Sequence, residues 1–409
     1  MTSDIPSPQV ERRMRWRILA VIGCLYTAQF IPFSFANMAL PIILRQEGYS
    51  AAQIGFLALA ALPYVFKFLW APLIDRFRLG RERYKSWIIG LSALHILAIV
   101  ALAFIGPDGH LTLLFVALLT ASLAISTQDV AVDALAISLM RDEERTMGST
   151  FQNGGLYAGA IIGGFGFLYL YGTIGWTIAL LIQAGLFALP LLTLSLVSEP
   201  DRPDGVAEID FLSAFRFFTQ DRIIGWLAVL ATMRLPLVLT FIPIRLMMVD
   251  QEMAIEEIAI WFGLLAMCAG GGATAIFGPL LRNLPLRKAI YLVGGLNLPI
   301  LILVTFIAAV FPAEIRYGII VIWVAIAITD VVMFRAAMDR TRPEIPGFDF
   351  SAQIAIYLLL ASFLEPLVGH IIDTRGYLPS FFAAIPLTLL PLLVLYGSTA
   401  TRRTRLTSH

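Results

Sequence analysis

Two carboxylates lie four residues apart inside a long apolar run, and they are the most informative groups in this sequence. Asp129 and Asp133 follow Gln128 in the run 111–139. In a helix this spacing places both acids on one face. Two carboxylates in one low-dielectric environment are costly to ionise together, so at least one is expected to take up a proton, as proton coupling requires. Asp129 lies deeper and is the preferred coupling residue.

The same two acids have other possible roles. They could pair with Lys67, or with Arg76 and Arg81, and so hold neighbouring helices together. They could also contact a substrate directly. All three roles would explain why costly charges are kept inside an apolar segment.

Buried charges recur in the second half of the chain. Arg234 lies in the middle of the run 223–248, too deep to reach water easily, and its guanidinium suits a carboxylate on a substrate or on another helix. Asp330 and Glu365, in the runs 317–338 and 350–372, complete the candidates for proton coupling. Asp330 could instead belong to a gate or latch, because Arg335 follows it.

Further polar and aromatic side chains inside the apolar runs could line a substrate cavity, and helix packing is the alternative for those of the first run. The candidates are Gln29, Phe33, Asn37, Gln128, Gln152, Tyr157, Arg234, Asn297 and Gln353. The glycines between 154 and 164 are better explained by close helix contact than by a ligand.

The segments that hold these residues predict a membrane protein. The chain is 59% hydrophobic and 14% charged over 409 residues, which leaves too few polar side chains to cover a soluble globule. A bilayer core requires roughly 20 apolar residues per helix, and helices satisfy every backbone group within it. The predicted transmembrane helices number twelve and span residues 16–44, 54–74, 87–105, 111–139, 149–171, 174–197, 223–248, 258–281, 288–310, 317–338, 350–372 and 378–396.

Loop charges and internal repeats organise these helices. Lys and Arg concentrate in the termini and in the loops on the N-terminal side, which predicts that both termini are cytoplasmic. Three short matches are all offset by six spans: 71–81 with 278–287, 124–130 with 327–331, and 150–152 with 349–353. The predicted fold is therefore an all-α membrane protein of two pseudo-symmetric six-helix bundles, 1–198 and 222–409, joined by a cytoplasmic linker, 199–221.

Several classes of chemistry find no support in the sequence. There is no nucleotide-binding loop, nucleophile motif or zinc-ligand cluster, and the arginines form no basic stripe for nucleic acid. We therefore expect no enzymatic activity, no cofactor, no metal site and no nucleic-acid partner. Any uphill transport would then depend on an ion gradient or on a partner.

Three motifs resemble the AmpG branch of the major facilitator superfamily, and the resemblance covers nearly the whole chain. They are residues 63–76 (PYVFKFLWAPLIDR), 126–134 (STQDVAVDA) and 143–148 (EERTMG). The branch includes muropeptide permeases, acetyl-CoA transporters and the RhtX/FptX siderophore permeases. The resemblance implies the major facilitator fold and a cytoplasmic gate at Asp75, Arg76 and Arg81, with Lys67 and Arg335 as further gating candidates. Residues 71–72 replace the usual glycine of the gating motif, as in the AmpG branch.

Within this branch, muropeptide permeases tend to be longer and acetyl-CoA transporters carry large insertions. A compact twelve-span chain is most similar to the siderophore permeases. The resemblance implies proton-coupled import of a ferric siderophore, or of a related bulky metabolite, across the bacterial inner membrane by a lipid-embedded monomer. The alternative is a muropeptide or acyl-thioester permease of the AmpG type.

Overall fold

The computed structural model describes residues 8–49, 53, 56–57, 59–77, 82–108, 110–199, 214–220, 222–253 and 255–396. The described residues are helical or lie in turns, and none of them forms a strand. The chain divides into two compact units, Met1–Glu208 and Ile209–His409. The division falls within the predicted linker, 199–221, but residues 200–213 and 221 lie outside the described residues, so the domain limits remain predictions.

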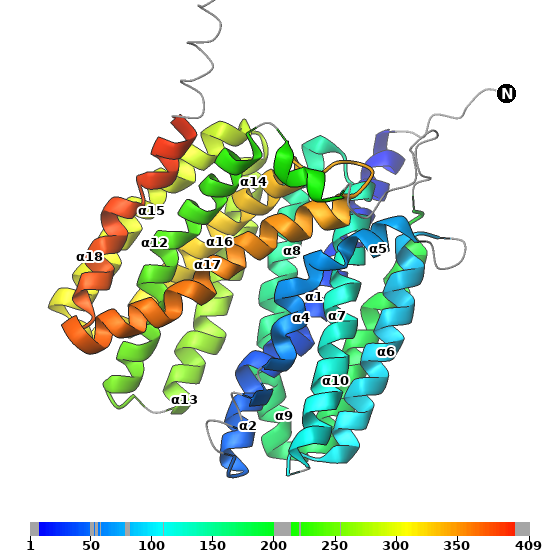
Figure 1. The fold of residues 1–409 in the computed structure, drawn as a ribbon, viewed down its shortest axis with the longest axis horizontal. Coiled ribbons are helices and arrows are strands. Elements are labelled where there is room, and N and C mark those ends of the chain that lie inside the picture. Colours follow the sequence, from blue (N-terminus) through cyan, green and yellow to red (C-terminus); the bar gives the residue numbers. More distant parts are fainter. Residues whose placement is uncertain are drawn as a thin grey trace, which may run out of the picture. The chain divides into compact units, whose positions relative to one another are not determined.

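Unit 1 contains long helices interrupted by short turns of 3-10 or π geometry (Figure 1). In chain order its elements are α1 (Pro8–Ser34), η1 (Phe35–Ala39), α2 (Leu40–Gln46), η2 (Leu59–Ala61), α4 (Leu62–Phe66), η3 (Lys67–Leu69), α5 (Ala71–Arg76), α6 (Tyr84–Ile105), α7 (Leu111–Leu139), η4 (Asp142–Glu144), α8 (Arg145–Ala160), η5 (Ile161–Gly166), α9 (Phe167–Ile174), α10 (Trp176–Ala188) and η6 (Leu189–Leu196).

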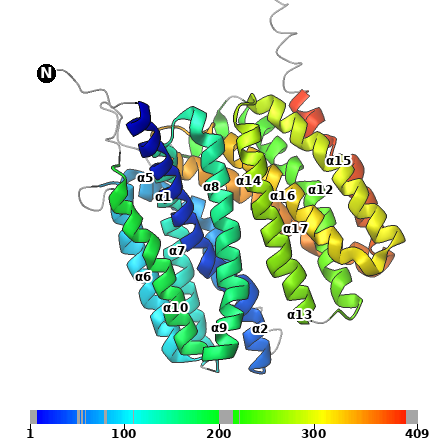
Figure 2. The same cartoon turned by 180° about the vertical axis from the view of Figure 1, so that it is seen from behind.

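Unit 2 is built in the same manner, and α16 packs against α12, α14 and α15 in it (Figure 2). Its elements are η7 (Phe215–Thr219), α12 (Ile223–Asp250), α13 (Ile255–Ile258), η8 (Ala259–Leu265), α14 (Ala266–Arg282), α15 (Leu286–Val310), η9 (Pro312–Glu314), α16 (Ile315–Met338), α17 (Pro346–Arg375) and α18 (Leu378–Leu387).

Ten helical segments of the described residues are long and apolar enough to cross a membrane, which confirms the prediction of an all-α membrane protein. The predicted eleventh span corresponds to α17. The predicted second span, 54–74, differs, because its described part consists of the four short pieces η2, α4, η3 and α5. Pro63 and Pro72 contribute to these breaks, since a proline lacks the N–H that would continue the helix.

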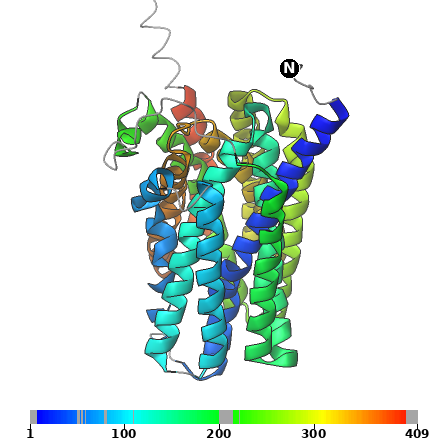
Figure 3. The same cartoon turned by 90° about the vertical axis from the view of Figure 1, so that its right-hand side faces the viewer.

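The seam between α1 and α8 shows why the predicted glycine-rich stretch is needed. A Cβ atom added to Gly155 would lie 2.7 Å from the carbonyl oxygen of Gly23. A Cβ atom added to Gly159 would lie 2.6 Å from the carbonyl oxygen of Thr27. At Gly163, in η5, the Cβ would lie 1.9 Å from the Ile31 oxygen. Glycine is therefore required for this close backbone approach. Figure 3 shows α1, in dark blue, running obliquely along the bundle.

Candidate functional site

The first cluster of buried charges lies in unit 1 and joins three helical segments. The ammonium of Lys67 forms an ion pair with Asp129, and its Nζ lies 3.6 Å from Asp133 Oδ2. The hydroxyl of Tyr26, from α1, donates a hydrogen bond of 2.5 Å to Asp133 Oδ1. We call these four residues, Tyr26, Lys67, Asp129 and Asp133, the N cluster.

The two acids of the N cluster differ in exposure. The side chain of Asp129 is 19% exposed, whereas that of Asp133 is 2% exposed. The preference for Asp129 as the coupling residue, which is based on its depth in the membrane, stays a prediction.

The broken second span explains how a lysine reaches these acids. Lys67 begins the 3-10 turn η3, and its side chain is buried against α7. The indole Nε1 of Trp70 donates to Thr127 Oγ1 at 3.0 Å, which fixes the turn against the same helix. Of the partners predicted for the two acids, Lys67 is the one found at the cluster. Arg76 is exposed, with its guanidinium 5.4 Å from the ring centre of Phe77, and Arg81 lies outside the described residues.

The second cluster lies in unit 2 and contains the predicted Arg234 and Asp330. Arg234 Nη1 lies 3.4 Å from Asp330 Oδ1 and 3.1 Å from the hydroxyl of Tyr357. Tyr357, from α17, also donates a hydrogen bond to Asp330. The Arg234 guanidinium lies 4.9 Å from the centre of the Tyr357 ring. We call Arg234, Asp330 and Tyr357 the C cluster; it realises the helix-to-helix pairing that the sequence left open for Arg234.

The residue before each repeated aspartate links its helix to a neighbour. Gln128 accepts from Gln29 Nε2 at 2.8 Å and donates to Ser92 Oγ at 3.3 Å. In unit 2, Asn297 Nδ2 donates to Thr329 Oγ1 at 3.0 Å. These contacts hold Gln128 and Asn297 between helices, which matches a packing role. Gln29 keeps a buried Oε1 atom with no hydrogen-bond partner among the described residues.

The repeated glutamines Gln152 and Gln353 have different surroundings. Gln353 accepts from Trp226 Nε1 at 2.6 Å and donates to the carbonyl oxygens of Ala337 and Asp349 at 3.1 and 2.9 Å. Its buried amide is thus fully engaged in holding the structure. Gln152 is also buried, but its Oε1 finds no partner among the described residues.

Two other predicted residues lie on the helices that carry the repeated glutamines. Tyr157 lies in α8 and is buried. Glu365 belongs to α17, but its side chain lies outside the described part of the structure. Its assignment to proton coupling therefore remains a prediction.

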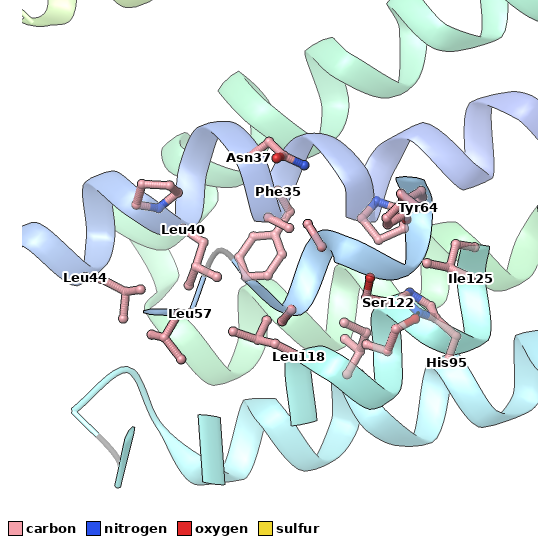
Figure 4. A pocket seen from close by; sticks show the side chains of 17 residues that line it. Phe35, Asn37, Leu40, Leu44, Leu57, Tyr64, His95, Leu118, Ser122 and Ile125 are labelled. Carbon is pink, nitrogen blue, oxygen red and sulfur yellow. Dashed lines mark hydrogen bonds between the residues drawn. The ribbon is translucent and has the colours of Figure 1, made fainter. Parts of the chain in front are cut away.

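A pocket of about 180 Å³ opens beside η1 in unit 1 (Figure 4). Asn37 lines it, and Phe33 packs at 5.1 Å, between ring centres, against the lining residue Tyr64. Figure 4 shows an apolar end near Leu44 and a polar end at Ser122 and His95. Ligand pockets usually measure about 300–1,000 Å³. This pocket is therefore too small to hold a bulky metabolite by itself.

The polar end of this pocket has a defined hydrogen-bonding character. His95 Nδ1 lies 2.9 Å from the Ala121 carbonyl oxygen, so Nδ1 must be the donor and Nε2 of the neutral ring is an acceptor. The buried Ser122 hydroxyl has no hydrogen-bond partner among the described residues. The sequence pattern indicated neither residue, because a single histidine or serine in an apolar run carries no distinctive signal.

The predicted gating residues separate into two arrangements. Asp75, fully buried at the end of α5, accepts from the Tyr84 hydroxyl at 3.0 Å and lies 4.0 Å from Arg83 Nη2. Tyr84 and Arg83 are thus two partners of Asp75, and the gating role of Asp75 stays a prediction. In unit 2, Arg335 Nη1 donates to the carbonyl oxygens of Leu281 and Leu284 at 3.4 and 3.0 Å, and so covers the end of α14.

Three tyrosines complete these sites, and their contacts with acids were not predicted from the sequence. Tyr26, Tyr84 and Tyr357 each donate a hydroxyl to a buried aspartate. Tyr357 lies four residues after Gln353, on the same helical face, and this spacing was the available signal. No comparable signal reveals that Tyr26 and Tyr84 face an acid on another helix.

A model of the Major Facilitator Superfamily matches residues 22–352, and the chain therefore belongs to this superfamily. Together with the fold, this makes the protein a multi-pass membrane transporter. The chain resembles the AmpG transporters in particular. It is 33% identical over 177 residues to "Putative transporter AmpG 4" of Rickettsia felis, which covers 42% of this chain and 43% of the relative.

Two further relatives extend this comparison. The chain is 28% identical over 196 residues to the "Anhydromuropeptide permease" of Escherichia coli K12, covering 47% of this chain and 39% of the relative. An uncharacterised protein of Haemophilus influenzae is 26% identical over 402 residues and matches 90% of this chain and 91% of its own length. The chain thus spans less than half the length of the relatives that carry a functional name.

Solved structures support the fold at low sequence identity. A bacterial homologue of the iron transporter ferroportin, in its outward-facing state, superposes with a TM-score of 0.72 at 16% identity and covers 94% of this chain and 99% of its own. The Major Facilitator Superfamily transporter FucP, in the outward conformation, gives 0.70 at 14% identity, covering 93% and 97%. At these identities the likeness concerns the fold alone.

Proposed function

We propose that this protein is a permease of the AmpG type that carries an anhydromuropeptide, or a similar bulky amphipathic anion, across the bacterial inner membrane. The named relatives support this proposal, since they are AmpG transporters and an anhydromuropeptide permease. Siderophore import remains a prediction. The relatives make it the second candidate.

Proton coupling at the N cluster is the second part of the proposal. The charge balance of this cluster carries the argument, because one lysine ammonium faces two carboxylates. An unbalanced charge is costly in a buried site, and one added proton makes the cluster neutral. The more exposed Asp129 is the residue that exchanges the proton, and Asp133 remains bound to Tyr26 and Lys67.

Substrate recognition is assigned to the C cluster. A guanidinium presents donors in a fixed geometry that matches a carboxylate. The peptide part of a muropeptide carries such groups. In the structure Asp330 and Tyr357 contact Arg234, and a substrate carboxylate would compete with Asp330 for the same guanidinium. In this proposal the ion pair holds Arg234 ready before substrate arrives.

Membrane placement belongs to the same proposal. The basic loops predict that both termini face the cytoplasm. With this orientation, protons that enter the cytoplasm down their gradient would carry solute with them from the periplasm. Gating by Asp75 and Arg335 would then occur on the cytoplasmic side.

The test uses purified full-length protein in liposomes with an imposed inward proton gradient. Labelled anhydromuropeptide should accumulate, and collapse of the gradient with a protonophore should stop this accumulation. Asp129→Asn should abolish accumulation while it preserves exchange of labelled for unlabelled solute. The matched control is Asp108→Asn, which makes the same chemical change outside the spans.

The alternatives give separate results in the same assay. Accumulation of a ferric siderophore without transport of anhydromuropeptide would replace the proposed substrate by the second candidate. Concentrative uptake by Asp129→Asn at the rate of the unmodified protein would remove this residue from proton coupling, whichever substrate is carried.

A further inference from the structure

A second, larger pocket lies at one end of unit 2, apart from both charged clusters. Its volume is about 750 Å³. The walls come from the beginning of α12, the beginning of α15 and the segment between α16 and α17, with Leu395 closing one side. The positive-inside pattern predicts that this end faces the cytoplasm.

The wall of this pocket is strongly basic. Its charged lining residues are Arg222, Arg287, Arg340, Arg342 and Asp339. Arg342 Nη2 lies 2.6 Å from Asp349, and Arg335 Nε lies 3.9 Å from Asp339. Among the described lining residues, four arginines accompany one acid.

Arg340 is held in place by contacts with neutral groups. Its guanidinium stacks on Trp226 with 3.9 Å to the ring centre, and Nη1 donates to the Ala336 carbonyl oxygen at 3.2 Å. Burial lowers the pKa of the Arg340 guanidinium from its ordinary value, and the nearby Asp339 carboxylate offsets part of this effect. A positive charge in these surroundings would gain from a nearby anion.

Backbone dipoles add to the same positive potential. The helices α12 and α15 have 28 and 25 residues, and Ile223 and Leu286, at which they begin, both line the pocket. The first N–H groups of a helix lack internal partners and attract anions. Gln220, also in the wall, has a buried Nε2 donor with no partner among the described residues.

We propose that this pocket binds a phosphate group, supplied either by the headgroup of an anionic phospholipid or by a free phosphate compound. Guanidinium groups and helix N-termini are the two protein features that suit phosphate oxygens best. The pocket also has apolar lining from Ile290, Val229 and Leu395, which suits a ligand that continues into acyl chains. Basic pockets at the cytoplasmic side of membrane helices bind such headgroups.

Thermal unfolding of the full-length protein in a neutral detergent tests this site. The probes are dioleoylphosphatidylglycerol, the zwitterionic dioleoylphosphatidylcholine, and inorganic phosphate. A ligand that binds only the folded protein raises the unfolding temperature. Phosphatidylglycerol should raise it by several degrees and phosphatidylcholine should not. Equal stabilisation by inorganic phosphate would identify free phosphate as a sufficient ligand, and its absence would identify the lipid.

Charge variants assign the effect to the pocket. Arg287→Gln removes an exposed lining charge and should reduce the shift by at least half, and Arg287→Lys should restore part of it. Arg282→Gln is the matched control, because Arg282 is exposed at the end of α14 and does not line the pocket. Arg340→Gln should abolish the shift if the variant folds, and Arg287→Gln decides the question if it does not.

The proposal is overturned if neither phosphatidylglycerol nor inorganic phosphate shifts the unfolding temperature. It is overturned equally if phosphatidylcholine gives the same shift as phosphatidylglycerol. Equal losses in Arg282→Gln and Arg287→Gln would also overturn it, because they would indicate attraction by the whole basic surface.

Discussion

The N and C clusters use the same kinds of side chain but hold different charge. Each contains a cation, a repeated aspartate and a tyrosine hydroxyl that donates to an acid. The N cluster adds Asp133. The repeat that pairs Asp129 with Asp330 pairs Asp133 with Phe334, whose ring packs 6.5 Å from that of Tyr357. Among the described side chains, the C cluster is therefore balanced without a proton, and the N cluster is not.

The source of the cation also differs between the two units. In unit 1 it comes from the broken second span, as Lys67. The same place in the eighth span, four residues before the repeated proline motif, holds Thr274, and Arg234 of α12 supplies the cation instead. Both six-helix units thus keep the repeated aspartate, but the cation that pairs with it comes from a different helix in each unit. This difference favours a proton-linked role in unit 1 and ligand recognition in unit 2.

The largest effect is expected when each cluster loses its cation. Lys67→Met leaves two buried carboxylates close together, whereas Arg234→Met leaves one. Breaking a buried ion pair lowers the free energy of unfolding by about 3–5 kcal/mol. The loss in Lys67→Met should be at the upper end of this range. Both should lose transport. Denaturant unfolding in detergent measures the difference, and a greater loss for Arg234→Met would contradict the excess negative charge assigned to the N cluster.

Removal of one acid should separate the clusters next. Asp133→Asn converts the N cluster to one cation and one carboxylate, and the amide oxygen can still accept from Tyr26. The free energy of unfolding should fall by only about 1 kcal/mol. Proton-driven accumulation should be lost, and exchange should be retained. Asp330→Asn removes the carboxylate that contacts Arg234 among the described residues, and it should lower the free energy of unfolding by about 3 kcal/mol.

Unfolding free energies and paired uptake and exchange assays check this contrast. Equal destabilisation by the two amides would show that the second carboxylate of the N cluster is not in excess. Accumulation that persists in Asp133→Asn would leave only Asp129 as a coupling residue.

Most of the fold could be predicted from the apolar runs. Twelve segments near the bilayer length and a common repeat offset are sufficient to predict two six-helix bundles, because helices are the economical way to satisfy a backbone in lipid. The exception is the second span. Pro63 and Pro72 indicate breaks in the helix, but the 3-10 turn that carries Lys67 depends on packing against α7 and could not be derived from the sequence.

The sequence could predict which buried residues require a partner, but it could not predict which residue provides it. A buried Arg234 requires an acid, but the sequence assigned Asp330 to proton coupling or to a gate and not to Arg234. For Tyr357 the only signal was its position four residues after Gln353, because a phenol is equally common in an apolar core. Likewise, Gln152 and Gln353 look equivalent in the sequence. The side-chain oxygen of Gln353 has a hydrogen-bond partner because the indole of Trp226, which is far away in sequence, packs beside it.

Packing around Tyr26 offers a smaller test of the N cluster. An alanine Cβ at Gly155 would lie 2.9 Å from the Cβ of Tyr26 and 2.7 Å from the Gly23 oxygen, so Gly155→Ala must displace α1. Overpacking of this kind costs about 1–3 kcal/mol, and uptake should fall as Tyr26 leaves Asp133. Gly154→Ala is the control, since nothing lies within 4 Å of its added Cβ. Equal uptake by the two variants would separate Tyr26 from coupling.

The repeated glutamines give the finest comparison between the two units. Gln353→Ala leaves the Trp226 donor and two backbone carbonyl groups without this partner, so it should cost about 1–3 kcal/mol in unfolding free energy. Gln152→Ala removes an amide whose oxygen is already unpartnered among the described residues and should cost less. If Gln152 meets substrate, its variant should instead raise KM in the uptake assay while the unfolding free energy stays nearly constant. A stability loss as large as that of Gln353→Ala, with KM unchanged, would make both glutamines packing residues and leave Arg234 as the substrate contact to test.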